Sequence, residues 1–244
     1  MEKRFVGIIQ ARTGSTRLPG KVLMPISGKP MLLRVVERTK RAKLLNDVVV
    51  ATTIKASDDA IANLCEVHGW PEFRGSEDDV LDRYFRAAQA YHADVVVRIT
   101  SDCPLIDPSL IDTTIRGFVT AHDCDYASNT LEPRTFPRGL DVEVFSYSAL
   151  HKAWQCDKKC SSREHVTPYI RQHPELFRLH SVEQTENYSN LRWTVDTIED
   201  LALVRRIYAY FGNDHFSWRD VLVAIQDNPE WLQINRNVQQ KQVL

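Results

Sequence analysis

The sequence lacks any large excess of charge. Its 31 lysines and arginines are balanced by 32 aspartates and glutamates, so the formal net charge at pH 7 is −1. A general basic field that would recruit nucleic acid is therefore not expected, and an anion would have to be held by a local group of cations. The balance predicts a small-molecule partner and no nucleic acid.

Long hydrophobic runs and a regular cysteine pattern are also missing. No apolar stretch has the length of a signal peptide or a membrane span, and the five cysteines are scattered and odd in number. We therefore expect a reduced, cytoplasmic protein with no membrane partner. Cys156 and Cys160 stand four residues apart, but no second cysteine or histidine pair has zinc-finger spacing, so unpaired thiols are favoured over a zinc site.

The chain is long for one domain and short for two, and its 43% hydrophobic residues can close a sizeable core. Short apolar runs at 5–10, 47–53 and 94–100 predict buried strands, and amphipathic helical segments follow them. This alternation predicts an α/β fold with a three-layer, mostly parallel sheet and a ligand beyond the carboxyl ends of its strands. We expect residues 1–244 to form a single domain.

The alternation breaks between Asp125 and Ser189, where shorter strands and two helices, at 147–154 and 163–172, are predicted. We interpret 125–189 as a mixed α+β insertion that covers the site and contributes to a homodimer contact.

The core pattern returns after this insertion. A buried strand is predicted at 191–196, and helices are predicted at 201–211 and 218–225. The polar end after Trp231 is expected to be a loose tail.

The first predicted strand leads into the loop "ARTGSTRLPGK", which has the composition of a phosphate site. Gly14 permits close approach of the backbone, and Arg12, Arg17 and Lys21 supply enough charge for a triphosphate. Neither familiar phosphate loop is present, because Val22 follows Lys21 and the third glycine of the dinucleotide pattern is missing. The alternative is that the arginines are solvated and the loop only turns the chain.

Two aspartates follow predicted strands, Asp102 after 94–100 and Asp196 at the end of 191–196. Strand ends meet at one edge of a parallel sheet, and Mg²⁺ prefers one or two carboxylates with water and phosphate oxygens. Both are therefore predicted metal ligands. The structural alternatives are a turn residue for Asp102, and for Asp196 the N-cap of a helix with Glu199 completing a capping box.

Six stretches in chain order resemble the cytidylyltransferases of the spore-coat polysaccharide biosynthesis protein F type. They are "IIQARTGSTRLPGKVL", "GSEDDVLDRY", "RITSDCPLIDP", "PRGLDVEVF", "REHVTPYI" and "WTVDTIEDL". The last is shared with the synthetases for cytidine monophosphate forms of sialic acid and 3-deoxy-manno-octulosonate. The resemblance implies a Rossmann-like, GT-A-like nucleotidyltransferase. Such an enzyme activates a sugar or sugar derivative with CTP for polysaccharide or glycan biosynthesis, releases pyrophosphate and depends on Mg²⁺.

The resemblance also implies roles for individual residues. The catalytic group would be Arg12, Arg17, Lys21 and Asp102, with Lys21 nearest the α-phosphate. Mg²⁺ would be held by Asp102 and Asp196. The implied nucleotide-binding residues, with Ala11 and the Gly75-Ser76 turn near the base, are Gln10, Ala11, Arg12, Gly14, Ser15, Arg17, Lys21, Gly75, Ser76 and Ser101.

The acceptor is expected to meet polar residues of the insertion. The candidates are Arg134, Arg138, Asp141, Glu143 and His165, which could contact hydroxyl, carboxylate or phosphate groups. A polar hairpin with ordinary salt bridges is the alternative. A nonulosonic acid and a sugar or polyol phosphate both remain open as acceptors.

Three other functions are considered. A uridylyl- or guanylyltransferase usually begins with a Gly-Gly loop, where this chain has Gln10-Ala11-Arg12. A glycosyltransferase that consumes a nucleotide sugar commonly has an Asp-x-Asp metal motif, where this chain has "SDC". The third alternative is a non-catalytic nucleotide-binding protein.

Overall fold

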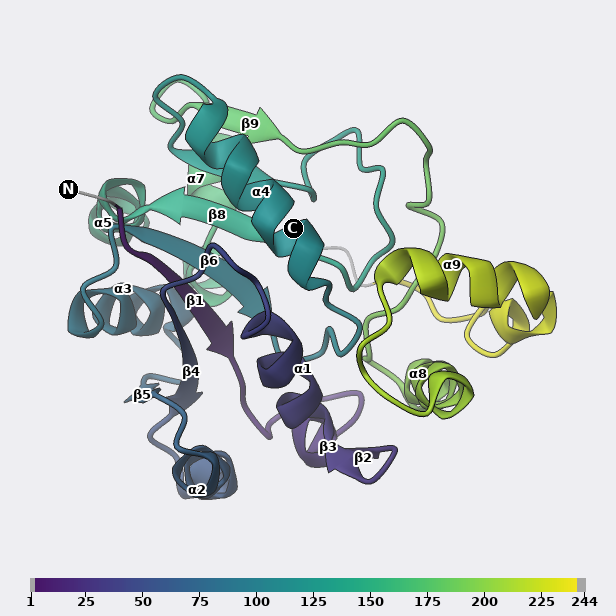
Figure 1. The fold of residues 1–244 in the computed structure, drawn as a ribbon. Coiled ribbons are helices and arrows are strands. Elements are labelled where there is room, and N and C mark those ends of the chain that lie inside the picture. Colours follow the sequence, from purple (N-terminus) through teal and green to yellow (C-terminus); the bar gives the residue numbers. More distant parts are fainter. Residues whose placement is uncertain (1–2, 241–244) are drawn as a thin grey trace.

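The structure is a computed structural model that describes residues 3–240 (Figure 1). Its strands are β1 (Phe5–Gln10), β2 (Pro25–Ile26), β3 (Lys29–Pro30), β4 (Asp47–Thr53), β5 (Glu72–Gly75), β6 (Val95–Thr100), β7 (Tyr126–Ser128), β8 (Glu143–Ser146) and β9 (Leu179–Ser181). Its α-helices are α1 (Met31–Thr39), α2 (Asp59–His68), α3 (Val80–Ala90), α4 (Pro108–Thr120), α5 (Tyr147–Cys156), α6 (Cys160–His165), α7 (Pro168–Gln172), α8 (Ile198–Phe211) and α9 (Trp218–Asp227).

A seven-stranded sheet in the order β5-β4-β1-β6-β8-β7-β9 forms the centre of the described chain. The first four strands in this order are mutually parallel, β8 is antiparallel to both of its neighbours, and β9 is parallel to β7. Gln10 at the end of β1 is in register with Ala51 and Thr100, so the carboxyl ends of three strands lie at one edge. The mostly parallel sheet predicted from the sequence is confirmed.

Helices cover both faces of this sheet (Figure 1). Along β1, Val6 and Ile8 pack in one apolar cluster with α3 and α5, whereas Ile9 packs in the other with α1 and α4. Side chains that alternate along a strand point to opposite faces, and a strand buried on both faces is therefore apolar throughout. This explains the apolar run at 5–10 and confirms the three layers.

The segment 125–189 extends the core sheet. Its strand β8 pairs directly with β6, and β7 and β9 follow on the far side of β8. The single helix predicted at 163–172 is wrong, because α6 ends at His165 and α7 begins at Pro168. Val166 has φ of +71°, and a proline two residues later disfavours continuation of the helix through that point. A role of this segment in dimerisation stays a prediction.

The strand predicted at 191–196 is also wrong, because this segment has no ladder of strand pairing. It forms only an isolated bridge between Arg138 and Arg192. The Val195 amide nevertheless donates to the Asp102 carbonyl at 2.8 Å, and this bond places Asp196 beside the end of β6.

The start of α8 corrects a second expectation about Asp196. The N-cap is Thr197, and Asp200 completes the capping box, so Asp196 and Glu199 do not fill these positions. The carboxylate of Asp196 is therefore not used as a helix cap.

The loose tail expected after Trp231 is wrong as far as residue 240, and residues 241–244 lie outside the described part. Asn235 is buried and donates to the Arg192 carbonyl and to Asp200 Oδ1, each at 2.9 Å. Gln240 accepts a hydrogen bond from Arg192. The chain end therefore packs against the 191–200 segment. Within the described residues, no helix has both the length and the apolar character needed to span a membrane.

Candidate active site

The loop after β1 is fixed by a buried carboxylate. Asp58 accepts hydrogen bonds from the Thr13 amide and the Thr13 hydroxyl, each at 2.7 Å, and from the Thr53 hydroxyl at the end of β4. Burial would raise the pKa of Asp58, but these hydrogen bonds and the charge of Arg83 hold it below its usual value. The Thr13 carbonyl in turn accepts from the amides of Ser15 and Gly20. The loop is therefore preformed.

A cleft of about 720 Å³ opens at this edge of the sheet. The residues predicted for the site that line it are Gln10, Ala11, Arg12, Ser15, Arg17, Lys21, Ser101, Asp102, Asp196, Arg134, Arg138, Asp141, Glu143 and His165. Gly14, Gly75 and Ser76 do not line it. The cleft joins the loop, the end of β6 and the insertion in one space large enough for two substrates.

Lys21 lies at the centre of the cleft floor between the two predicted metal ligands. Its ammonium donates to Asp102 Oδ2 at 2.9 Å, to Asp196 Oδ1 at 2.9 Å and to the Val195 carbonyl at 2.8 Å. Burial alone would lower the pKa of Lys21, but the two carboxylates outweigh it and raise the pKa above its usual value. Two aspartates 94 residues apart in sequence thus share one cation.

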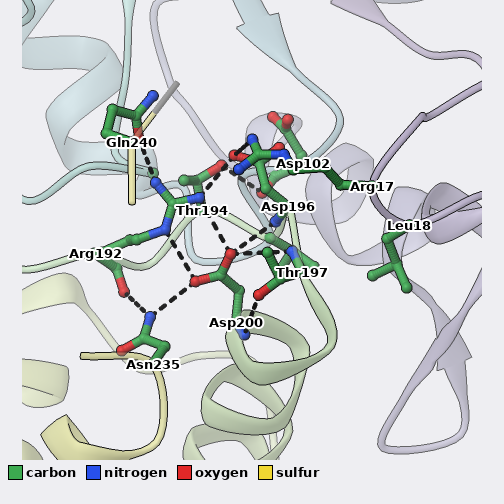
Figure 2. Close-up of polar contacts among 12 residues, drawn as sticks. Arg17, Leu18, Asp102, Arg192, Thr194, Asp196, Thr197, Asp200, Asn235 and Gln240 are labelled. Carbon is green, nitrogen blue, oxygen red and sulfur yellow. Dashed lines mark hydrogen bonds and ion pairs between the residues drawn. The ribbon is translucent and has the colours of Figure 1, made fainter. Parts of the chain in front are cut away.

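Asp196 is oriented by further cations (Figure 2). Its Oδ2 forms an ion pair with Arg17 at 2.9 Å and accepts a hydrogen bond from Arg192 at 2.7 Å. Arg192 also donates to both oxygens of Asp200, at 3.0 and 3.1 Å, and Asp200 accepts from the Asp196 amide at 3.0 Å. Neither Arg192 nor Asp200 was predicted. The only sequence signal was the capping spacing from Thr197 to Asp200.

The pKa values in this cluster follow its charge pairs. Burial would raise the pKa of Asp102 and of Asp200, but Lys21 and Arg192 respectively lower them. Both acids are therefore ionised at neutral pH.

Arg12 lines the cleft and pairs there with two acids. Its guanidinium is 3.3 Å from Glu164 of α6 and 3.7 Å from Glu77. A Cβ on Gly14 would lie 3.1 Å from the same Glu77 carboxylate, which is the flexible end of that side chain. Such partly exposed ion pairs are weak, so Arg12 can exchange its partners for a phosphate at little cost.

The Gly75-Ser76 turn lies beside the cleft. The Gly75 carbonyl accepts from the Ile54 amide at 3.0 Å, and the Ser76 carbonyl accepts from Arg83 at 2.7 Å. Arg83 itself lines the cleft and was not predicted from the sequence. A role for Gly75 and Ser76 near the base stays a prediction.

Three of the predicted acceptor residues are held in ion pairs, and these are Glu143, Arg134 and Asp141. Glu143 pairs with Arg98 and accepts from the hydroxyls of Tyr126 at 2.7 Å and Thr167 at 2.5 Å. Burial would raise the pKa of Glu143, and Arg98 lowers it. Arg98 was missed, although an arginine inside the apolar run at 94–100 was a visible signal.

Arg134 has a similar structural role. It pairs with Asp141 and donates to the carbonyls of Phe136 and Pro137, each at 3.0 Å. For these residues the salt-bridged hairpin considered from the sequence is what the structure shows.

Two other arginines that line the cleft have donors to spare. No hydrogen bond or ion pair joins the Arg138 guanidinium to any described residue, and the buried Nε of Arg171 has no hydrogen-bond partner there. Both side chains line the cleft, as does His165. Burial and the nearby Arg134 lower the pKa of Arg138. A bound anion would supply the missing acceptors.

The side chains of the site suit a Mg²⁺ ion that also binds phosphate oxygens and water better than they suit a metal ion bound by protein ligands alone. Among residues 3–240, no three histidine, cysteine or acidic side chains come together as a metal-binding group. Asp102 and Asp196 provide two carboxylates around one point that already holds a cation. Mg²⁺ commonly takes one or two carboxylates and completes its shell with water and phosphate oxygens. The residues present are therefore suited to a magnesium–nucleotide complex.

Comparisons with known proteins give one consistent result. Residues 6–223 match the family described as Cytidylyltransferase. An uncharacterized protein of Methanocaldococcus jannaschii is 42% identical over 98% of this chain and 97% of its own. Spore coat polysaccharide biosynthesis protein SpsF of Bacillus subtilis is 35% identical over 91% of this chain and 94% of its own. The structure of a cytidylyltransferase from Leptospira borgpetersenii superposes with a TM-score of 0.91 at 35% identity, covering 99% of this chain and all of that one.

Proposed function

We propose that this chain, which belongs to the cytidylyltransferase family, transfers the cytidylyl group of CTP to a sugar derivative in a Mg²⁺-dependent reaction. The observation that carries the metal and triphosphate assignment is the contact of Lys21 with both Asp102 and Asp196, directly beside the cationic loop. A cytidylyl transfer needs cations where the triphosphate lies and carboxylates where its metal lies, and the cleft has both.

The reaction is an in-line displacement at the α-phosphorus. An acceptor oxygen forms a bond to that phosphorus, and the bond to pyrophosphate breaks. Little covalent help is required, because such transfers are accelerated mainly by positioning and by neutralising charge. In this proposal Lys21 holds an α-phosphate oxygen. Arg12 and Arg17 suit the leaving pyrophosphate, since each guanidinium can bind two oxygens at once. Mg²⁺, held by Asp102 and Asp196, would supply further neutralisation of phosphate charge.

An anionic sugar derivative is the proposed acceptor. The cleft is lined by Arg138, Arg171 and His165, and the guanidinium groups of Arg138 and Arg171 have unused donors. A sugar acid or a sugar or polyol phosphate would satisfy them. The full-length likeness to a spore coat polysaccharide biosynthesis protein supports a role in polysaccharide formation. The homodimer and the cytoplasmic location expected from the sequence stay predictions.

A panel of CTP, UTP, GTP and ATP, each with Mg²⁺, tests the nucleotide assignment. We expect CTP to raise the melting temperature most, because at equal concentration the ligand that binds the folded state most tightly stabilises it most. We also expect pyrophosphate to be released from CTP only when an acceptor is added. Equal stabilisation by UTP or GTP would contradict the cytidine selectivity.

A further inference from the structure

Both proposed metal ligands already contact cations of the chain. Lys21 contacts both carboxylates, and Arg17 and Arg192 contact the other oxygen of Asp196. Arg192 also contacts Asp200. The cluster therefore contains three cations and three anions. The cations are Lys21, Arg17 and Arg192, and the anions are Asp102, Asp196 and Asp200. A bare divalent ion would therefore enter a cluster that has no negative charge left to offer.

The Lys21 ammonium occupies the position that a metal ion bound by both aspartates would take. It lies 2.9 Å from one oxygen of each carboxylate, and the Val195 carbonyl at 2.8 Å holds it from a third side. Carboxylate oxygens bind Mg²⁺ at about 2.1 Å, so an ion bound by both aspartates would take the place of the ammonium. If the ammonium stayed in place, it and the Mg²⁺ ion would lie so close together that they would repel strongly in a buried site.

We propose that Lys21 is a built-in counter-ion that excludes free divalent metal from Asp102 and Asp196, so that the metal enters only together with the nucleotide. The triphosphate offers Lys21 and Arg17 new partners while its metal takes over the carboxylates. The nucleotide half of the proposal rests on the proposed function, whereas the exclusion of free metal does not.

Direct binding of Mn²⁺ without nucleotide tests the proposal, with the loss of the free-ion electron paramagnetic resonance signal as the readout. We expect weak binding to the unaltered protein and binding at least about tenfold tighter to Lys21→Met, because the competing charge is gone. Lys21→Gln serves the same purpose if the methionine variant fails to fold. Lys21→Arg keeps the charge and is expected to bind no more tightly than the unaltered protein.

Two controls locate the gain. Lys55→Met removes an exposed lysine that pairs with Glu77, and it should leave Mn²⁺ affinity unchanged. Adding Asp196→Asn to Lys21→Met should abolish the gain. The proposal is overturned if Lys21→Met and Lys21→Gln bind Mn²⁺ no more tightly than the unaltered protein, or if the double variant keeps the gain. None of these Mn²⁺-binding measurements contains a nucleotide. A failure of the cytidylyltransferase assignment in the nucleotide panel would therefore not change their outcome.

Discussion

Replacing Asp102 with asparagine is expected to lower kcat by about a thousandfold while the protein stays folded. The amide keeps the shape of the side chain but removes one of the two charges proposed to hold the metal. Lys21 keeps its bonds to Asp196 and to the Val195 carbonyl, so the cleft floor retains most of its contacts. The measurement is the rate of pyrophosphate release from CTP with acceptor and saturating Mg²⁺, alongside the melting temperature.

Asp227→Asn is the matched control, because this aspartate is exposed at the end of α9, far along the chain from the loop. It should change neither rate nor melting temperature. Near-normal turnover in Asp102→Asn would remove Asp102 from the metal site.

Replacing Gly139 with alanine is expected to destabilise the protein by more than about 3 kcal/mol. Gly139 has φ of +102°, and a Cβ there would lie 2.4 Å from the Thr194 amide nitrogen and 2.6 Å from the Trp193 carbonyl carbon. Both obstacles are backbone, so no side-chain rotation can relieve them. The displaced segment includes Val195 and leads to Asp196, and we therefore expect activity to fall as well. Urea unfolding followed by tryptophan fluorescence gives the stability change.

Gly69→Ala separates the cost of backbone conformation from the cost of the clash. Gly69 follows the last residue of α2 as its C-cap and has φ of +61°, and a Cβ there would meet nothing within 4 Å. We expect this control to lose only about 1 kcal/mol. If Gly139→Ala lost no more than Gly69→Ala, the close approach at Thr194 would be unimportant.

The core strands could be predicted because their signal is local. The runs at 5–10 and 47–53 coincide with β1 and β4 to the residue, since strands buried on both faces need continuous apolar side chains. The start of α4 was equally readable, because Pro108 is preceded by Asp107, whose side chain accepts from two amides of the first turn.

The errors come from residues whose conformation depends on distant partners. The segment at 191–196 has an apolar pattern, but the approach of Gly139 and the bond from Val195 to Asp102 hold it without a ladder of strand pairing. The end after Trp231 is polar, but Asn235 is buried because Arg192 and Asp200 accept its amide hydrogens. No local pattern contains these contacts.

The site was partly predictable for the same reason. A cationic loop after β1 and an aspartate after β6 are local features, and parallel topology brings them together. The sequence did not predict which charged side chains of the cleft form ion pairs with each other. Glu143 and Arg134 are held in ion pairs, whereas the guanidinium groups of Arg138 and Arg171, which line the cleft, keep unused donors. Only the folded arrangement distinguishes these arginines.

The central claim is that Lys21, Asp102 and Asp196 surround one metal–nucleotide complex. Anomalous diffraction from crystals grown with CTP and Mn²⁺, without acceptor, tests it most directly. The account predicts one manganese peak bound by both aspartates and phosphate oxygens, with the Lys21 ammonium moved onto the triphosphate. A manganese ion bound elsewhere, with Lys21 still between the two carboxylates, would contradict it.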